Sequence, residues 1–217
     1  MGSNVVRQLN IGGYDNNFSY FIVGHSDKKI AIVDPGNFGF LESEILLNGF
    51  MPELILLTHS HHDHVEALDE MVEKYKIPVY FHKNAMPKIG VEAGLARTVD
   101  DEDVIEMDGV KILVMHTPGH IDDAVCYYIS GENSDDKIPK LITGDTLFVE
   151  ACGRADLNGS NVEDLYKSLQ RIKKLSDETE VYPGHDYGSI PISTIAHEKK
   201  HNRFLRCANV EEFRKIR

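Results

Sequence analysis

Three things are scarce in this chain of 217 residues: cysteine, long apolar runs and positive charge. Its three cysteines, Cys126, Cys152 and Cys207, are too few and too scattered for a disulfide framework or a cysteine-rich zinc finger, which favours a reducing, cytoplasmic location. No apolar run approaches the roughly 20 residues that cross a bilayer, and no secretory signal pattern opens the sequence, so we expect no membrane partner. With 23 basic against 35 acidic side chains the net charge is −12, which argues against a nucleic-acid partner.

Short apolar runs bounded by turn residues predict strands, and apolar residues at helical spacing predict helices between them. We expect strands at 20–23, 30–33, 54–58, 79–81, 104–105, 110–115, 125–129, 141–142 and 181–182. Helices are expected at 41–48, 65–75 and from 162 onward, the last after a capping box formed by Ser160 and Glu163. Strands arrive as meanders in each half, which predicts two packed sheets with helices on their outer faces.

The C-terminal residues differ from the rest of the chain in charge. Residues 197–217 hold seven basic and three acidic side chains, which leaves a net −16 on residues 1–196. We expect one domain over 1–196 and, at 197–217, a short basic segment packed on it. A solvated helix is the simpler interpretation of this segment, and attraction of anions toward the active-site mouth is the alternative.

The densest cluster of chemistry-bearing residues is Thr58-His59-Ser60-His61-His62-Asp63-His64, directly after an expected strand. In extended backbone, residues two apart point the same way, so His59 and His61 can reach one point. Asp63 and His64 lie where the chain turns into a helix and can reach a neighbouring point. Burying several unpaired imidazoles would cost roughly 1–3 kcal/mol each, so a metal site explains the cluster better than packing does.

Three shorter motifs also follow strands and combine a His or Asp with a glycine. They are His116-Thr117-Pro118-Gly119-His120, Thr143-Gly144-Asp145-Thr146 and Tyr182-Pro183-Gly184-His185-Asp186-Tyr187. Each motif is weak alone, because a single His or Asp in a turn is usually structural. Together with the first cluster they predict metal ligands collected at one edge of the sheets.

This set of motifs, in this order, resembles the metallo-β-lactamase superfamily over nearly the whole chain. Within the superfamily, the stretches Ala31-Ile32-Val33-Asp34-Pro35, Thr143-Gly144-Asp145-Thr146-Leu147-Phe148 and Cys152-Gly153-Arg154 are similar to glyoxalase II (hydroxyacylglutathione hydrolase) and to persulfide dioxygenase. The resemblance implies an α/β (α+β) fold, a four-layer αββα sandwich of two mixed sheets flanked by helices, with metals at one edge.

The resemblance also implies roles for individual residues. The first metal would be held by His59, His61 and His116, the second by Asp63, His64 and His185, with Asp145 shared between them. The carboxylates Asp63 and Asp145 are expected to be catalytic as well. Asp34 would support a ligand imidazole from behind, and His120 would be a supporting or packing residue. Arg154 and Tyr187 match substrate-contact positions.

The function that this resemblance implies is hydrolysis of an acyl thioester, such as an S-acylglutathione, by a hydroxide bridging two divalent metals. Zn²⁺ is the first choice of metal, and Fe or Mn²⁺ also suits these ligands. The alternative is a persulfide dioxygenase with a single iron on His59, His116 and Asp145. The stretch Cys152-Gly153-Arg154-Ala155-Asp156 is similar to a stretch of those enzymes. A lactonase, a phosphodiesterase or a metal-binding module without catalysis remain further alternatives, and the sequence leaves the oligomeric state open.

Overall fold

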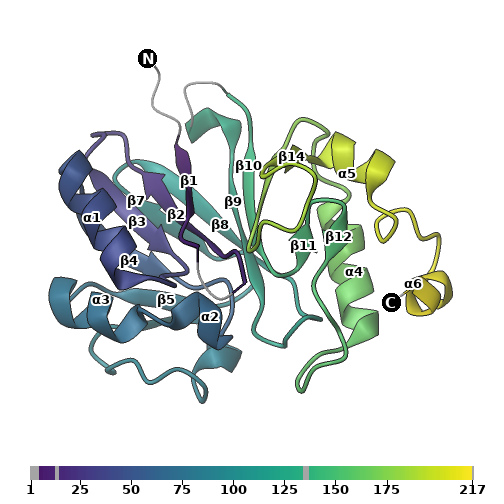
Figure 1. Cartoon of the computed structure of the whole chain (residues 1–217), viewed down its shortest axis with the longest axis horizontal. Helices are drawn as coiled ribbons and strands as arrows, with labels where there is room; N and C mark the ends of the chain where they lie inside the picture. Colours follow the sequence, from purple (N-terminus) through teal and green to yellow (C-terminus); the bar gives the residue numbers. More distant parts are fainter. Residues whose placement is uncertain (1–4, 13–14, 134–136, 217) are drawn as a thin grey trace.

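The computed structural model describes residues 5–12, 15–133 and 137–216. Two six-stranded mixed sheets pack face to face, with α1 to α3 covering one outer face and α4 to α6 covering the other (Figure 1). The expected four-layer αββα sandwich is therefore confirmed. Among the described residues, no helix has the length and apolar character needed to cross a bilayer.

The first sheet holds its strands in chain order. Its strands are β1 (Val6–Asn10), β2 (Phe18–Val23), β3 (Lys29–Val33), β4 (Met51–Leu56), β5 (Val79–His82) and β6 (Ala96–Val99). Pairing is antiparallel from β1 to β3 and parallel from β3 to β6. The helices α1 (Phe38–Asn48), α2 (His62–Val65) and α3 (Leu68–Tyr75) connect these parallel strands, and a short 3₁₀ turn, η1 (Lys83–Ala85), follows β5.

The second sheet has the order β14-β13-β10-β9-β8-β7. Its strands are β7 (Val104–Met107), β8 (Val110–His116), β9 (Val125–Ile129), β10 (Lys140–Gly144), β13 (Glu180–Pro183) and β14 (Ser193–Thr194), with a 3₁₀ turn, η2 (Gly131–Asn133), after β9. A separate hairpin joins β11 (Leu147–Phe148) to β12 (Ala151–Cys152). The flanking helices are α4 (Val162–Ile172), α5 (Ile195–His201) and α6 (Val210–Ile216).

Three apolar layers hold the sandwich together. Side chains from the inner faces of both sheets, among them Tyr20, Leu56 and Tyr127, form the central layer. The outer layers lie under the helices, and Phe213 of α6 is fully buried against the layer formed with Leu165 of α4. Because β3 and β4 run parallel, their carboxyl ends meet at one edge, and the parallel pair β10 and β13 brings its ends to the same side of the molecule.

Two expected local features differ in the structure. The helix expected at 65–75 is instead α3, which begins at Leu68 and is separated from α2, because the backbone N–H of Ala67 donates to Pro35 O and interrupts the helical ladder. The cap of α4 is Asn161 and not Ser160: the Asn161 side chain accepts from Asp164 N, whereas the Ser160 hydroxyl donates to Leu157 O.

Candidate metal centre

The segment after β4, a short loop followed by α2, carries four of the expected ligands and is fixed by Asp34, the residue after β3. Asp34 has a left-handed backbone (φ 50°), and its carboxylate accepts from Thr58 N at 2.7 Å and from Thr58 Oγ1 at 2.6 Å. The same carboxylate lies 3.0 Å from His64 Nδ1. One buried carboxylate therefore holds both ends of the His59–His64 loop, so Asp34 does contact a candidate ligand from behind.

Three imidazoles form the first ligand set. His61 Nδ1 lies 3.1 Å from His59 Nε2 and 2.9 Å from His120 Nε2. Their nitrogens lie within 4.8 Å of one another and face a common point. The Ser60 side chain and N–H between the first two rings are held by the buried Asp123, at 2.6 and 3.2 Å.

The second ligand set combines two imidazoles with a carboxylate. His64 Nε2 lies 3.3 Å from His185 Nε2, and Asp63 Oδ2 lies 3.5 and 3.4 Å from these two nitrogens. Asp145 lies between the two sets. Its Oδ1 is 3.3 Å from His64 Nε2, while its Oδ2 is 3.2 Å from His185 Nε2 and 3.5 Å from His120 Nε2.

These distances fit metal ions. Four ligands at 2.0–2.1 Å around a tetrahedral metal lie about 3.3 Å apart, close to the separations observed in both sets. Asp145 Oδ1 is buried and accepts no well-aligned hydrogen bond from the described residues. The nitrogens of His59, His64, His120 and His185 that face away from the centre each lie against an oxygen, on Thr58, Asp34, Arg154 and Asp15 respectively. Such outer contacts fix the tautomer and orientation of metal-binding imidazoles.

The protonation states also suit cations. Burial lowers the pKa of His59 well below its usual value and lowers that of His61, so both rings are neutral and offer lone pairs. Burial alone would raise the pKa of Asp145, but the neighbouring His64 and His185 hold it well below its ordinary range. The pKa of Asp63 is lowered in the same way, since His64 and the hydrogen bond from Asn17 outweigh burial.

The imidazoles beside the carboxylates respond in the opposite direction. Burial would lower the pKa of His64, but Asp145 and Asp34 raise it well above the usual value, and Asp145 likewise raises the pKa of His185. The carboxylates therefore stabilise positive charge at this point of the site. A bound cation would supply that charge without a proton.

The structure corrects one expected ligand. His116, the last residue of β8, lies away from both sets: its Nε2 is 3.0 Å from Asp122 O, and its ring stacks on His82 at 3.9 Å. His120 occupies the place that was expected for His116. The reason is the turn at Gly119 (φ 140°), which packs against α4 and brings the chain back toward the centre at His120, four residues after His116.

The two expected substrate contacts lie at the rim of the site. The exposed Arg154 guanidinium makes two contacts with Asp156, at 2.9 and 3.0 Å, while its backbone oxygen lies against His120. The Tyr187 ring stacks on His185 at 4.8 Å, and its hydroxyl donates to the Asp15 carboxylate. Both residues are thus next to ligands, although their side chains are engaged within the protein.

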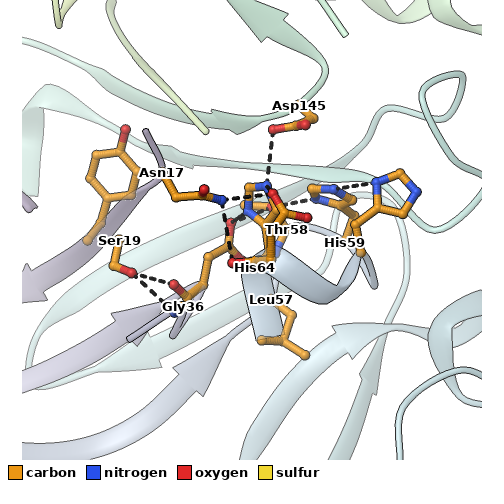
Figure 2. A network of polar contacts seen from close by, with 12 residues as sticks. Asn17, Ser19, Gly36, Leu57, Thr58, His59, His64 and Asp145 are labelled. Carbon is orange, nitrogen blue, oxygen red and sulfur yellow. Dashed lines mark hydrogen bonds and ion pairs between the residues drawn. The ribbon is translucent and has the colours of Figure 1, made fainter. Parts of the chain in front are cut away.

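Sequence reasoning missed Asn17 and Asp123. Asn17, labelled in Figure 2, is 2% exposed. It donates from Nδ2 to Asp63 Oδ2 at 2.8 Å and pairs through its backbone with His185. Asn17 therefore connects two members of the second set. Its partner carboxylate is 46 residues away in sequence, and Asp123 is 63 residues from Ser60, so no local pattern marks either residue.

Comparisons with known proteins concern the family of the whole chain. A family profile described as the metallo-beta-lactamase superfamily matches residues 12–185. The probable metallo-hydrolase YqgX of Bacillus subtilis (strain 168) is 34% identical over an alignment of 216 positions, and the alignment covers 92% of this chain and 96% of that protein. The probable polyketide biosynthesis zinc-dependent hydrolase PksB of the same organism is 30% identical over 204 residues, 93% of this chain and 87% of that protein.

Two solved structures have a similar fold. ETHE1 from Myxococcus xanthus superimposes with a TM-score of 0.83 at 29% identity, over 98% of this chain and 89% of that chain. TTHA1623, solved in a di-iron-bound form, superimposes with a TM-score of 0.76 at 28% identity, over 91% of this chain and 99% of that chain.

Proposed function

Because this chain belongs to the metallo-beta-lactamase superfamily, we propose that it is a metal-dependent hydrolase of the glyoxalase II type that cleaves an acyl thioester. The observation that carries the proposal is the pair of ligand sets joined by Asp145. His59, His61 and His120 would hold one ion, and Asp63, His64 and His185 would hold another. The names of YqgX and PksB, a metallo-hydrolase and a zinc-dependent hydrolase, support the hydrolytic class.

A pair of divalent metals, when bound, makes water nucleophilic near neutral pH and polarises a carbonyl oxygen. The chain's own residues prepare the rest. Asp34, Thr58 and Asp123 fix the ligand loop before substrate arrives. The Asp63 side chain is 32% exposed, against 10% for Asp145, so Asp63 is the carboxylate that a substrate and its water can reach. Its lowered pKa keeps Asp63 ionised and able to orient a water proton.

A thioester suits this site because its leaving group is a thiolate. A thiolate departs with little protonation, and the ionised carboxylates of this centre are not proton donors at neutral pH. Outside the ligand sets, the protein groups against the centre are mainly oxygens that accept from imidazole nitrogens. An ester or amide, whose leaving group needs a proton, would react more slowly here.

The test uses protein loaded separately with Zn²⁺, Fe²⁺ and Mn²⁺, and follows thiol release from S-lactoylglutathione and other acyl thioesters. Asp145→Asn should reduce the rate more than about a hundredfold, because even an outer contact of a metal ligand is worth 10–100-fold. Asp156→Asn, a carboxylate on the exposed rim, is the matched control. The proposal fails if none of the metal forms cleaves any acyl thioester.

A second candidate is a persulfide dioxygenase with one iron, and two observations favour it. The fold is similar to ETHE1, and the Cys152-Gly153-Arg154-Ala155-Asp156 stretch lies directly against the centre through Arg154 O. With the corrected ligand, the iron would be held by His59, His120 and Asp145. Oxygen uptake by the iron form on addition of glutathione persulfide would support this candidate, and a flat oxygen trace with about two metals per chain would exclude it.

A further inference from the structure

A groove of about 510 Å³ lies between the segment after β12 and the C-terminal helix α6. Its lining includes Arg154, Arg203 and Arg214, with Val162, Phe204 and Ile216 as apolar walls. A second hollow of about 450 Å³ shares Arg203 and Ile216 with it and adds Arg206, Lys215 and one carboxylate, Glu212. The two hollows therefore form one basic surface, here named the basic groove.

The cations of the basic groove are not all compensated. Arg154 pairs with Asp156, and Arg214 pairs with Glu163. Arg203, Arg206 and Lys215 have no carboxylate partner within the described part of the chain, and the Arg203 guanidinium packs over the Phe204 ring at 4.7 Å. Although the net charge of the protein is −12, three cations without a carboxylate partner therefore lie together in the basic groove.

The basic groove adjoins the outer side of the first ligand set, at the His120 nitrogen that faces away from the centre. Arg154, which lines the groove, has its backbone oxygen 2.9 Å from His120 Nδ1. Gly153 lies so close to Asp145 that an added Cβ would come within 1.8 Å of the Asp145 backbone oxygen. The strand-end segment that forms one wall of the groove is therefore also the support of two candidate ligands.

The side of the centre at Asp63 has the reverse charge. A hollow of about 460 Å³ there is lined by Asp15, His62, Asp63 and Glu66. An anionic ligand would be repelled from that side and attracted to the basic groove. Field differences of this kind orient a charged substrate as it approaches.

We propose that the basic groove binds the phosphate of a phosphopantetheine thiol, so that the thioester cleaved at the centre is one carried by such a phosphate-bearing thiol. This inference rests on the proposed thioesterase function and names its leaving thiol. Three uncompensated cations at one place match the charge of a phosphate better than the separate carboxylates of glutathione, and arginine holds phosphate with paired N–H groups. The apolar walls formed by Val162, Phe204 and Ile216 suit the uncharged pantetheine arm.

The experiment compares three thioesters with the same acyl group: acetyl-CoA, S-acetylglutathione and the uncharged S-acetyl-N-acetylcysteamine. In metal-loaded protein, kcat/KM should be highest for acetyl-CoA, and its advantage over the uncharged thioester should fall as salt is added. In the variant Arg203→Gln/Arg206→Gln, the ratio of these two kcat/KM values should fall about tenfold or more. Lys28→Gln/Lys111→Gln, which removes the same charge elsewhere, should leave the ratio unchanged.

Calorimetric titration with free coenzyme A gives a readout independent of turnover. Binding should be about tenfold weaker in the Arg203→Gln/Arg206→Gln variant than in the control variant. A preference for an acetylated carrier protein over acetyl-CoA would identify the protein-bound source of the same phosphopantetheine. The inference would be overturned if kcat/KM were equal for all three thioesters and coenzyme A bound both variants with the same affinity. The thioesterase proposal would then remain intact. Loss of all thioester cleavage would instead remove the proposed function.

Discussion

The two halves of the molecule supply their ligands in different ways. The first half places four ligands within six residues, His59, His61, Asp63 and His64, on one loop held by Asp34. The second half supplies His120, Asp145 and His185 singly, from the ends of three separate strands. The loop depends on local spacing and one carboxylate, whereas the second half depends on tight turns at glycines. Each half should therefore be sensitive to a different kind of substitution.

The largest difference should appear between His120→Ala and His116→Ala. His120→Ala removes a member of the first set, so it should release about one metal per chain and reduce activity more than a hundredfold. His116→Ala should keep both metals and cost only about 1 kcal/mol of the free energy of unfolding, since it loses a ring stack and a hydrogen bond. Elemental analysis and denaturant unfolding measure the two effects. Metal loss from His116→Ala would contradict the corrected ligand set.

The dependence of the second half on glycine can be tested at Gly184. A Cβ there would lie 2.2 Å from Asp145 Oδ1 and 2.9 Å from His64 Cε1, so Gly184→Ala must displace candidate ligands. We expect metal affinity to fall about 10–100-fold, measured by competition with a chelator. Gly90→Ala is the matched control, because an added Cβ at Gly90 meets nothing within 4 Å. Equal affinities in the two variants would show that the turn has room to adjust.

Asn17→Ala should have a smaller and more selective effect. It removes the hydrogen bond to Asp63 and leaves the first set untouched. We expect about tenfold weaker binding at the second metal position, with the first metal retained, in a two-site titration. The exposed Asn158 provides the control Asn158→Ala. Weakening of both positions alike would mean that Asn17 acts on the fold and not on Asp63.

The smallest effect is expected for the rate of chemical labelling of Cys126. This buried residue of β9 lies next to the strands that lead to His120 and Asp145. Its Sγ lies 3.3 Å from Thr117 Oγ1, and burial raises the pKa of the thiol to about 11. At pH 8 only about one thiol in a thousand is ionised, so labelling of the folded protein should be very slow, and it should accelerate as the pH approaches 11. Metal removal should change this rate little, as followed by mass spectrometry with the half-buried Cys152 as the internal reference.

The sequence predicts most of the layers because buried strands here are short apolar runs between turn residues. The β1 strand was not predicted, since Val6-Arg7-Gln8-Leu9-Asn10 has little apolar pattern and its strand character comes from pairing with β2. The ligand loop was predicted from spacing alone because its geometry is local. His116 was assigned as a ligand from the family resemblance, which was matched to the His that directly ends a strand. The informative signal is the preceding glycine: Asp145 follows Gly144, His185 follows Gly184, and His120 follows Gly119.

Asp123 and Asn17 lie beyond such reasoning, because their partners are brought close only by the packing of the whole domain. The same holds for the cap of α4, where Ser160 and Asn161 are both suitable residues and the backbone of the folded loop decides between them.

Each candidate ion position draws on both sheets. The first takes two imidazoles from the loop after β4 and one from beyond β8, and the second takes two ligands from that loop and one from beyond β13. An ion in either position would therefore link the two sheets at one edge of the sandwich, while the three apolar layers stabilise its interior. Removal of the metals by a chelator should make that edge more mobile and leave the rest of the protein folded. The rigidity of the catalytic edge would therefore depend on its metals.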